Sequence, residues 1–203
     1  MSCDSTTEAP TEAEETPVVS NNSAHRGTPD VPMIVPELNP QHADVIEYQR
    51  RRLGTKVGFV TVKPNCSIQS YVPALTALYD LKPSRVVVST YQAASGAGAK
   101  AMQELYAQTQ QFLNGEELTV DAFAHQIAFN CIPHIDKFLE DDSTKEEWKM
   151  VVETKKIFGD DSIEVAPTCV RVPVLRCHAE SVNVEFNGPI SPEKAKEVLK
   201  EKL

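Results

Sequence analysis

Cys66 stands at a position where a thiol can act as a nucleophile. It follows the β-branched and aromatic run Val57–Val62, which predicts a strand, and precedes Ser67–Tyr79, which predicts a helix despite Pro73. A thiol at a strand-to-helix junction feels the positive end of the helix dipole, which lowers its pKa and favours thiolate near neutral pH. A lone cysteine is more often a small buried hydrophobic residue, so position alone leaves both interpretations open.

We predict that Cys169–Cys177 form a strand. Arg171 lies in this strand, and His178, seven residues after Arg171, directly follows it. An odd spacing gives the two side chains opposite parity, so a regular strand points them to opposite faces. Pro173 breaks the ladder or forces a bulge, and one added residue restores a common face. His178 then suits acid or base chemistry near neutral pH, although a surface histidine is the commoner case.

Ser95, Gly96, Ala97 and Gly98 form a small-residue loop between a predicted strand and a predicted helix. Backbone amides in such a loop can approach a phosphate or a flat ring closely. The third glycine of a dinucleotide-binding motif is absent, and no acidic residue follows at the expected distance of about twenty residues. A tight structural turn is therefore the alternative interpretation.

Glu153 and Lys156 are three residues apart, so one helix face can present both charges to a zwitterionic substrate, although a solvated ion pair is the usual outcome. Ser143 and Glu146 fit an S-x-x-E capping box for the start of this helix, and Gly159 fits its end. Its predicted apolar face consists of Trp148, Val151 and Val152.

Strands and helices alternate along the rest of the chain, which predicts an α/β or α+β fold with an open mixed sheet flanked by helices. We expect folded structure to begin near Pro17, after an acidic tail over residues 1–17. The remaining predicted elements are Pro17–Ser20, His42–Arg52 ended by Gly54, Arg85–Tyr91 as a buried strand, Lys100–Leu113, Ser181–Phe186 and a last helix that opens at Ser191-Pro192-Glu193.

Composition excludes several classes of protein. The 203 residues are 41% hydrophobic and 24% charged, as in a globular protein. The net charge is -9 with no basic stripe, which argues against a nucleic-acid partner. Five cysteines without CxxC spacing predict neither a disulfide framework nor a zinc site, and they favour a cytoplasmic location. No apolar run approaches the roughly 18 residues of a membrane span.

Eight segments, in order, resemble the aspartate-semialdehyde dehydrogenase family, and the resemblance runs from about Val18 to the C-terminus. The segments are residues 22–26, 30–40, 64–67, 89–98, 127–130, 145–149, 153–156 and 169–178. The resemblance implies that Cys66 is the acyl-thioester nucleophile, that His178 is the general acid and base, and that Gln92 positions the reacting carbonyl. The implied ligand contacts are Arg171 for the substrate carboxylate, Glu153 for its amino group, Arg26 and Lys156 for phosphate, and Ser95, Gly96, Ala97 and Gly98 for NADP(H).

The implied activity is NADP-dependent reductive dephosphorylation of L-aspartyl 4-phosphate to L-aspartate 4-semialdehyde, a step of lysine, threonine and methionine biosynthesis, by a cytoplasmic homodimer or homotetramer. Two residues depart from the family pattern around Cys66. Lys63 stands where the family has asparagine, and Ile68 stands where it has threonine. These departures indicate a subgroup or an altered phosphate site.

The resemblance also implies missing parts. No glycine-rich turn for the cofactor pyrophosphate precedes Val18, and family members continue beyond the last predicted helix. We therefore expect residues 18–65 to be a remnant of the cofactor-binding domain and residues 66–203 to be an incomplete catalytic and dimerisation domain. Such a chain has no complete Rossmann domain and binds NADP(H) weakly, and its unfinished sheet favours dimerisation or aggregation.

Three alternatives stay open at this point. An acyl-phosphate reductase of the N-acetylglutamyl-phosphate or glyceraldehyde-phosphate type shares the thioester chemistry but has different residues around its cysteine. A non-enzymatic scaffold keeps the dimerising fold and binds a partner or a small anion. A cysteine hydrolase that uses Cys66 and His178 is the third, although no oxyanion or peptide-binding signature accompanies the pair.

Overall fold

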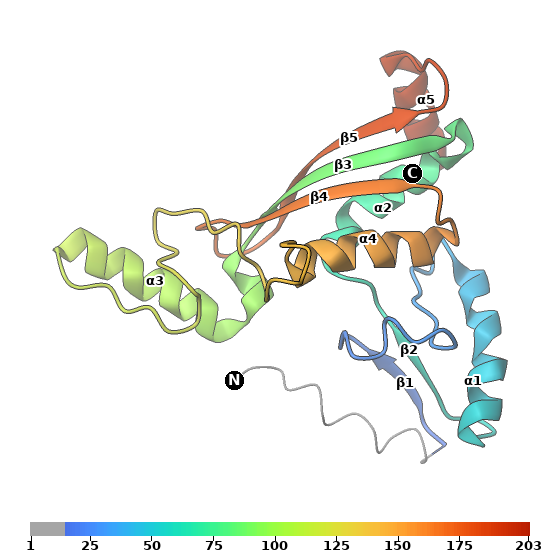
Figure 1. The fold of residues 1–203 in the computed structure, drawn as a ribbon, viewed down its shortest axis with the longest axis horizontal. Helices are drawn as coiled ribbons and strands as arrows, with labels where there is room; N and C mark the ends of the chain where they lie inside the picture. Colours follow the sequence, from blue (N-terminus) through green and yellow to red (C-terminus); the bar gives the residue numbers. More distant parts are fainter. Residues whose placement is uncertain (1–14) are drawn as a thin grey trace.

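Two separate sheets organise the chain in the computed structural model, which describes residues 15–203 (Figure 1). The predicted acidic tail falls outside the described residues up to position 14. Pro17, the last residue assigned to that tail, is the first residue of strand β1. The predicted domain boundaries at 17 and 65 stay predictions.

The smaller sheet consists of two parallel strands, β1 (Pro17–Ser20) and β2 (Phe59–Val62). A 3-10 turn, η2 (Pro40–Val45), and helix α1 (Ile46–Leu53) connect them. Gly54 ends α1 in the left-handed region, with a φ of +72°, as the sequence predicts. Gln49 on α1 ties the layer together because its side chain bonds the backbone of Val60 in both directions.

The larger sheet has three strands in the order β4-β3-β5 and is mixed, which confirms the predicted fold class. The central strand β3 (Pro83–Gln92) pairs in parallel with β4 (Glu164–Arg171) and antiparallel with β5 (Ala179–Phe186). Helices α2 (Ile68–Ala77) and α4 (Lys145–Phe158) cover one face of it. Tyr79–Leu81 form a short 3-10 turn, η3, after α2, and α5 (Pro192–Lys202) packs against α2.

Burial alternates along β3, so the prediction of a strand buried throughout is wrong. Val86 and Val88 are completely buried against the helices, whereas Tyr91 on the opposite face is 45% exposed. Burial alternates because helices cover one face of the sheet, whereas among the described residues no element of secondary structure covers the other. We call this second surface, formed by residues 85, 87, 89 and 91 and their neighbours on β4 and β5, the open sheet face.

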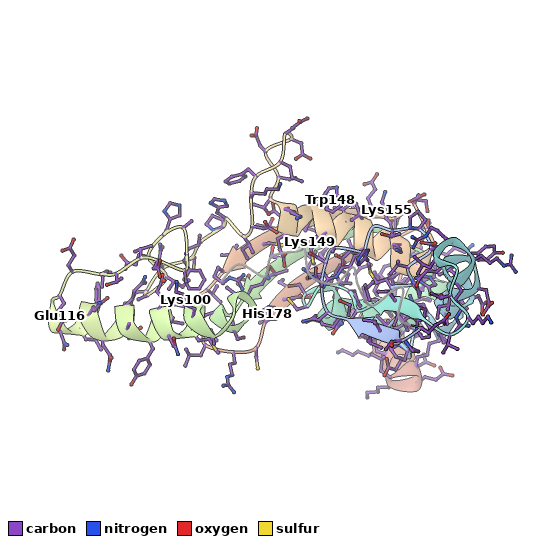
Figure 2. The ribbon with its side chains drawn as sticks, turned by 90° about the horizontal axis from the view of Figure 1, so that it is seen from below. Lys100, Glu116, Trp148, Lys149, Lys155 and His178 are labelled. Atoms are coloured by element: carbon purple, nitrogen blue, oxygen red, sulfur yellow. The ribbon has the colours of Figure 1, made fainter. Side chains whose placement is uncertain are left out.

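A long helix extends from one end of the larger sheet. The turn η4 (Ala94–Ala97) leads from β3 into α3 (Ala99–Asn114), and Figure 2 shows α3 with Lys100 near one end and Glu116 just past the other. The segment that follows returns along α3 and forms a small cluster with it. Its buried members are Ala94, Leu105, Ile127, Ala128 and Ile132.

The start of α4 lies one residue later than the sequence predicted. Thr144 and Glu147 form the capping box, not Ser143 and Glu146. The predicted apolar face is wrong as well. Trp148 is 46% exposed, Val151 and Val152 are partly buried, and the core contacts come instead from Met150 and Ile157.

The predicted strand Cys169–Cys177 is also wrong, because β4 ends at Arg171 and the chain then leaves the sheet. Residues 173–177 are exposed and cross to β5 as a loop. The last helix agrees with its prediction, since Ser191 caps it and Pro192 begins it. No helix within residues 15–203 has the length and apolar character needed to cross a membrane.

Candidate active site

Cys66 and His178 meet at the surface, although 112 positions separate them in the chain. The Cys66 Sγ atom lies 3.4 Å from His178 Nε2. His178 Nδ1 accepts a hydrogen bond from the Ala93 amide at 3.0 Å. A neutral imidazole that accepts at Nδ1 carries its proton on Nε2, so the ring donates toward the Cys66 sulfur. The pair is arranged so that the ring can donate a hydrogen bond to a thiolate at Cys66.

The surroundings of the pair shift both pKa values. Burial of the sulfur and the nearby Glu146 carboxylate raise the pKa of the Cys66 thiol. The charges of Lys63 and Arg171 and the Ser67 amide act in the opposite direction. The predicted lowering by the dipole of α2 is therefore outweighed. Burial and the nearby Arg171 lower the pKa of His178, so the ring is neutral at neutral pH.

A cavity of about 730 Å³ opens beside Cys66 and is lined mainly by polar side chains. Among the predicted site residues, Cys66, Gln92, Arg26 and Arg171 line it, with Ser95 and Gly96 at its edge. Residues that the sequence interpretation did not select line it too: Asn21, Asn65, Asp136, Glu146 and Lys149. His178 lines an adjoining cavity of about 300 Å³ that shares Cys66, Ser95 and Gly96.

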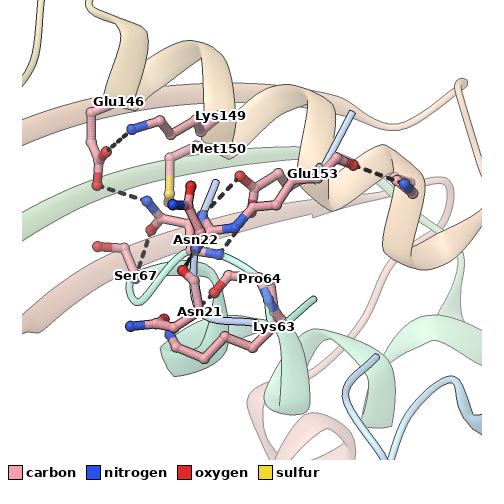
Figure 3. A network of polar contacts seen from close by, with 12 residues as sticks. Asn21, Asn22, Lys63, Pro64, Ser67, Glu146, Lys149, Met150 and Glu153 are labelled. Atoms are coloured by element: carbon pink, nitrogen blue, oxygen red, sulfur yellow. Dashed lines mark hydrogen bonds and ion pairs between the residues drawn. The ribbon is translucent and has the colours of Figure 1, made fainter. Parts of the chain in front are cut away.

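Glu146 is the centre of a buried network in the larger cavity (Figure 3). Its Oε1 accepts hydrogen bonds from Asn65 Nδ2 at 2.8 Å and from Gln92 Nε2 at 3.1 Å. Its Oε2 pairs with Lys149 Nζ at 3.2 Å. Burial alone would raise the pKa of Glu146, but Lys149 and the two amides outweigh it and hold the pKa below its usual value. A fixed negative charge therefore lies beside Cys66.

Lys149 places a fixed positive charge next to that carboxylate. Its ammonium also pairs with Asp136 at 2.9 Å, and its side chain is 13% exposed. Burial opposes the charged form, but Glu146 and Asp136 raise the pKa of Lys149 above its usual value. The ammonium stays protonated at neutral pH and faces the cavity as an anion-binding group.

Arg171, the last residue of β4, is 7% exposed and reaches the same cavity. Its Nη1 donates to the Ala93 carbonyl at 2.7 Å, and burial lowers its pKa. A β-carbon at Gly96 would lie 2.9 Å from Arg171 Nη1 and 3.2 Å from His178 Nε2. Arg171 and His178 therefore do converge, through the 172–178 loop and not through the predicted bulge.

Arg26 and Glu153 form a buried ion pair at 3.2 Å. The other Glu153 oxygen accepts the Asn65 amide at 2.7 Å, and Glu153 is 3% exposed. Burial raises the pKa of Glu153 despite Arg26. Glu153 does not line this cavity but lines a neighbouring one of about 500 Å³, together with Arg26, Lys149 and Lys156. Its contacts position Arg26 and Asn65.

Lys156 is turned away from the cavity. Its ammonium donates to the carbonyls of Arg26, Thr28 and Val31 at 2.8, 2.8 and 3.0 Å. These bonds hold the segment that carries Arg26. The role of Lys156 as a phosphate ligand stays a prediction that these contacts do not favour.

The sequence contains the E-x-x-K spacing twice in α4, as Glu146–Lys149 and as Glu153–Lys156. Seven residues separate the copies, so both lie on nearly the same side of the helix. The sequence interpretation selected the second copy. The sequence interpretation did not select the first copy, because it placed Glu146 in the capping box at the start of the helix.

The loop Ser95–Gly98, predicted to contact NADP(H), lies beside Cys66 and could hold a flat ligand. Ser95 and Gly96 separate the two cavities beside Cys66, and Gly96 lacks a side chain that would fill the space next to Arg171 and His178. Ala97 lines a small neighbouring cavity, and Gly98 adopts a φ of +94° that permits the turn into α3. A flat ring placed along Ser95 and Gly96 would reach the Cys66 sulfur.

Comparison with known proteins gives consistent matches. The family model described as "Semialdehyde dehydrogenase, dimerisation domain" matches residues 75–202. Aspartate-semialdehyde dehydrogenase of Aquifex aeolicus is 50% identical over 185 residues, which cover 90% of this chain and 52% of that protein. The chain thus spans about half the length of the curated relatives it matches.

Solved structures of the same enzyme also match. The structure of aspartate semialdehyde dehydrogenase II complexed with ASA from Vibrio cholerae has a TM-score of 0.82 and 45% identity, over 91% of this chain and 52% of that one. The enzyme with NADP from Candida albicans has a TM-score of 0.66 and 28% identity, over 94% of this chain and 50% of that one.

Proposed function

Because this chain belongs to the aspartate-semialdehyde dehydrogenase family, we propose that it carries the nucleophile and substrate-binding part of that activity. The proposed reaction is the NADP-dependent reductive dephosphorylation of L-aspartyl 4-phosphate through a thioester on Cys66. One observation carries the proposal: the Cys66 sulfur lies 3.4 Å from His178 Nε2 at the edge of a cavity with fixed charges of both signs.

Arg171 and Glu146 are arranged to bind the two charges of an amino acid. The planar guanidinium of Arg171 suits a carboxylate, and Glu146 offers a carboxylate that stays ionised for an ammonium group. The resemblance assigned the ammonium contact to Glu153. We assign it to Glu146, because Glu146 lines the cavity whereas Glu153 is held by Arg26 and the Asn65 amide.

Arg26 and Lys149 are the cations that line the cavity away from Arg171, together with Lys63. An acyl phosphate whose phosphoryl group bound there would have its acyl carbon facing Cys66. The Cys66 sulfur attacks that carbon, the bond from carbon to the phosphate oxygen breaks, and phosphate leaves with the electron pair. Lys149 and Arg26 stabilise the charge that develops on the leaving oxygen.

Ser95 and Gly96 would hold the nicotinamide cofactor, which would supply the hydride for reduction of the thioester. His178 serves the steps around sulfur. Its Nε2–H donates a hydrogen bond that stabilises the Cys66 thiolate before attack, once the thiol proton has passed to solvent, and again when the carbon–sulfur bond breaks. Gln92, fixed between Thr90 and Glu146, orients the reacting carbonyl.

A homodimer built on the open sheet face is the assembly we propose. The matched family model is described as a dimerisation domain. The open sheet face includes Val87 with Ala166 and Asn183 as its neighbours on β4 and β5. Its burial in a dimer would supply the cover that helices supply on the other face.

Acylation tests the proposal without requiring hydride transfer. Purified chain mixed with L-aspartyl 4-phosphate should release phosphate in a burst of one equivalent per Cys66, and intact-mass spectrometry should find the aspartyl group on residues 57–85. Cys66→Ala should abolish both signals, and Cys131→Ala, which changes an exposed cysteine outside the cavity, should leave them unchanged. Phosphate release that survives Cys66→Ala would contradict the proposal.

Hydride transfer is tested separately by phosphate-dependent reduction of NADP with aspartate semialdehyde. N-acetylglutamate semialdehyde and glyceraldehyde 3-phosphate serve as competing substrates. We expect turnover, where present, to be confined to aspartate semialdehyde, because a ligand without a free amino group cannot make the ammonium contact that we assign to Glu146.

A further inference from the structure

A second thiol shares a cavity with Cys66. The cavity of about 300 Å³ is lined by Cys66, Cys177 and His178, with Ser70, Ser95 and Gly96. Cys177 directly precedes His178, whose Nε2 lies 3.4 Å from the Cys66 sulfur. Both cysteines are exposed, and Cys177 takes no part in the proposed transfer chemistry. We propose that Cys66 and Cys177 form a reversible disulfide when a hydroperoxide oxidises Cys66.

The other described cysteines do not share this position. Cys169 is completely buried on β4 and does not line the cavity. Cys131 is exposed in the segment that returns along α3 and does not line the cavity. Among these four thiols, Cys66 and Cys177 are therefore the pair that a local movement can join.

The backbone around Cys177 is suited to that movement. Residues 173–177 are exposed and lie outside the sheet ladder, and two bonds attach this loop to η4, from Ala94 N to Val174 O at 2.8 Å and from Ser95 N to Leu175 O at 3.0 Å. Cys177 itself has a φ of +70°, a left-handed conformation that costs energy for a residue with a β-carbon. A disulfide needs Cα atoms about 4.4 to 6.8 Å apart, so the loop must move Cys177 toward Cys66 over the cavity that they share.

The chemistry balances without a further reactant. The Cys66 thiol loses its proton, the thiolate attacks one oxygen of hydrogen peroxide, and the oxygen–oxygen bond breaks. The hydroxide that leaves takes up the released proton as water, and a sulfenic acid remains at Cys66. The Cys177 sulfur then attacks the sulfenic sulfur, and the hydroxyl leaves as water with the thiol proton. Two thiols are oxidised by two electrons, one peroxide is reduced, and two waters form.

The disulfide would have two consequences for the site. It blocks the Cys66 sulfur, and it draws His178 from its position beside that sulfur because the two residues are adjacent in the chain. It also removes the sulfenic acid before further peroxide can convert it irreversibly to sulfinic or sulfonic acid. Cys177 would thus act as a resolving cysteine that makes the inhibition reversible.

Peptide mapping tests this proposal independently of any enzymatic activity. Trypsin separates the described cysteines, because Cys66, Cys131, Cys169 and Cys177 fall in residues 57–85, 101–137, 157–171 and 177–194. Dilute full-length chain is treated with hydrogen peroxide, its remaining thiols are blocked, and it is analysed without reductant. We expect a crosslink between peptides 57–85 and 177–194 in protein that migrates as a single chain, and we expect dithiothreitol to restore both thiols.

Cys177→Ser and Cys131→Ser are the matched variants. Cys177→Ser should lose the crosslink and accumulate sulfinic and sulfonic acid on peptide 57–85, whereas Cys131→Ser should behave as the unmodified chain. Near-ultraviolet circular dichroism of each variant checks that the fold is retained. Irreversible oxidation of Cys66 without a crosslink in the unmodified chain overturns the proposal, and so does a disulfide that joins two separate chains.

Discussion

Glu146 and Glu153 lie two helical turns apart on α4, and their surroundings differ. Glu146 faces the larger cavity with a lowered pKa, whereas Glu153 is closed off by Arg26 and has a raised pKa. The same residue type at the same distance from a lysine therefore serves two purposes. One carboxylate is available to a ligand, and the other holds two protein groups in place.

Glu146→Gln and Glu153→Gln separate these purposes. Glu146→Gln should weaken the binding of aspartate semialdehyde by about one to two orders of magnitude, because it removes the charge that pairs with the ammonium group. Glu153→Gln should lower the free energy of unfolding by about 2 kcal/mol, because it leaves the Arg26 charge buried without a counter-charge. Calorimetric titration and urea unfolding measure the two effects. If Glu153→Gln weakened binding and Glu146→Gln lowered the free energy of unfolding instead, the ammonium contact would belong to Glu153.

Glu180 gives a second prediction at this scale. Both its carboxylate oxygens are buried without a hydrogen bond of good geometry among the described residues, and burial, weakly opposed by the nearby Ser67 hydroxyl, raises its pKa from 4.5 to about 7. A carboxyl whose pKa is raised by folding contributes its full stability below the unfolded pKa and loses it as pH rises through the folded value. The chain should therefore become less stable between pH 5 and pH 8.

Glu180→Gln should remove that loss. A shift of this size corresponds to about 3 kcal/mol, which partial access to solvent reduces to about 1 kcal/mol. We expect the variant to match the unmodified chain at pH 5 and to exceed it by that amount at pH 8, in urea unfolding at both pH values. An equal difference at the two pH values would assign the effect to packing and not to ionisation.

At the scale of elements, helix ends were predictable where a single residue determines them. Gly54 and Gly159 end α1 and α4 in the left-handed region, and Ser191 caps α5. The start of α4 was not predictable, because both Ser143 and Thr144 have a glutamate three residues later. Tertiary contact decides between them, since Glu147 also accepts the Cys169 amide of β4 at 3.1 Å.

Thr144→Ala and Ser143→Ala test which capping box operates. Thr144 is 1% exposed and its hydroxyl accepts the Glu147 amide. Thr144→Ala should therefore lower the free energy of unfolding by about 1 kcal/mol, whereas Ser143→Ala should change it by less than about 0.5 kcal/mol. Equal losses in thermal unfolding would mean that both residues cap the helix.

In the site, as in the elements, local features were predictable from the sequence and features decided by tertiary contacts were not. The place of Cys66 between a strand and a helix is a local feature that made it a candidate nucleophile, and the family resemblance then assigned that role. Arg171 and His178 were predicted to share a face through a bulge, but they meet because β4 ends and the loop 172–178 returns the chain to Gly96. Glu146 and Lys149 could not be chosen over Glu153 and Lys156 without knowing which helical turn faces Cys66.

At the scale of the molecule, the open sheet face determines the expected assembly. Val87→Glu places a charge in the middle of this face and should convert the dimer to a monomer, because a carboxylate in such an interface lacks a partner. Tyr106→Glu on α3, where Tyr106 is 60% exposed, is the control and should stay dimeric. Sedimentation velocity distinguishes the two. A dimeric Val87→Glu would move the interface to another surface.

The projecting helix α3 also affects how the chain moves through water. Its 16 residues extend about 24 Å, and the helix lies beyond the end of the larger sheet (Figure 1). A compact protein of this length has a radius of gyration of about 17 Å. X-ray scattering from the monomeric Val87→Glu variant should give a larger value and an asymmetric pair-distance distribution, and the chain should diffuse more slowly than a sphere of its mass.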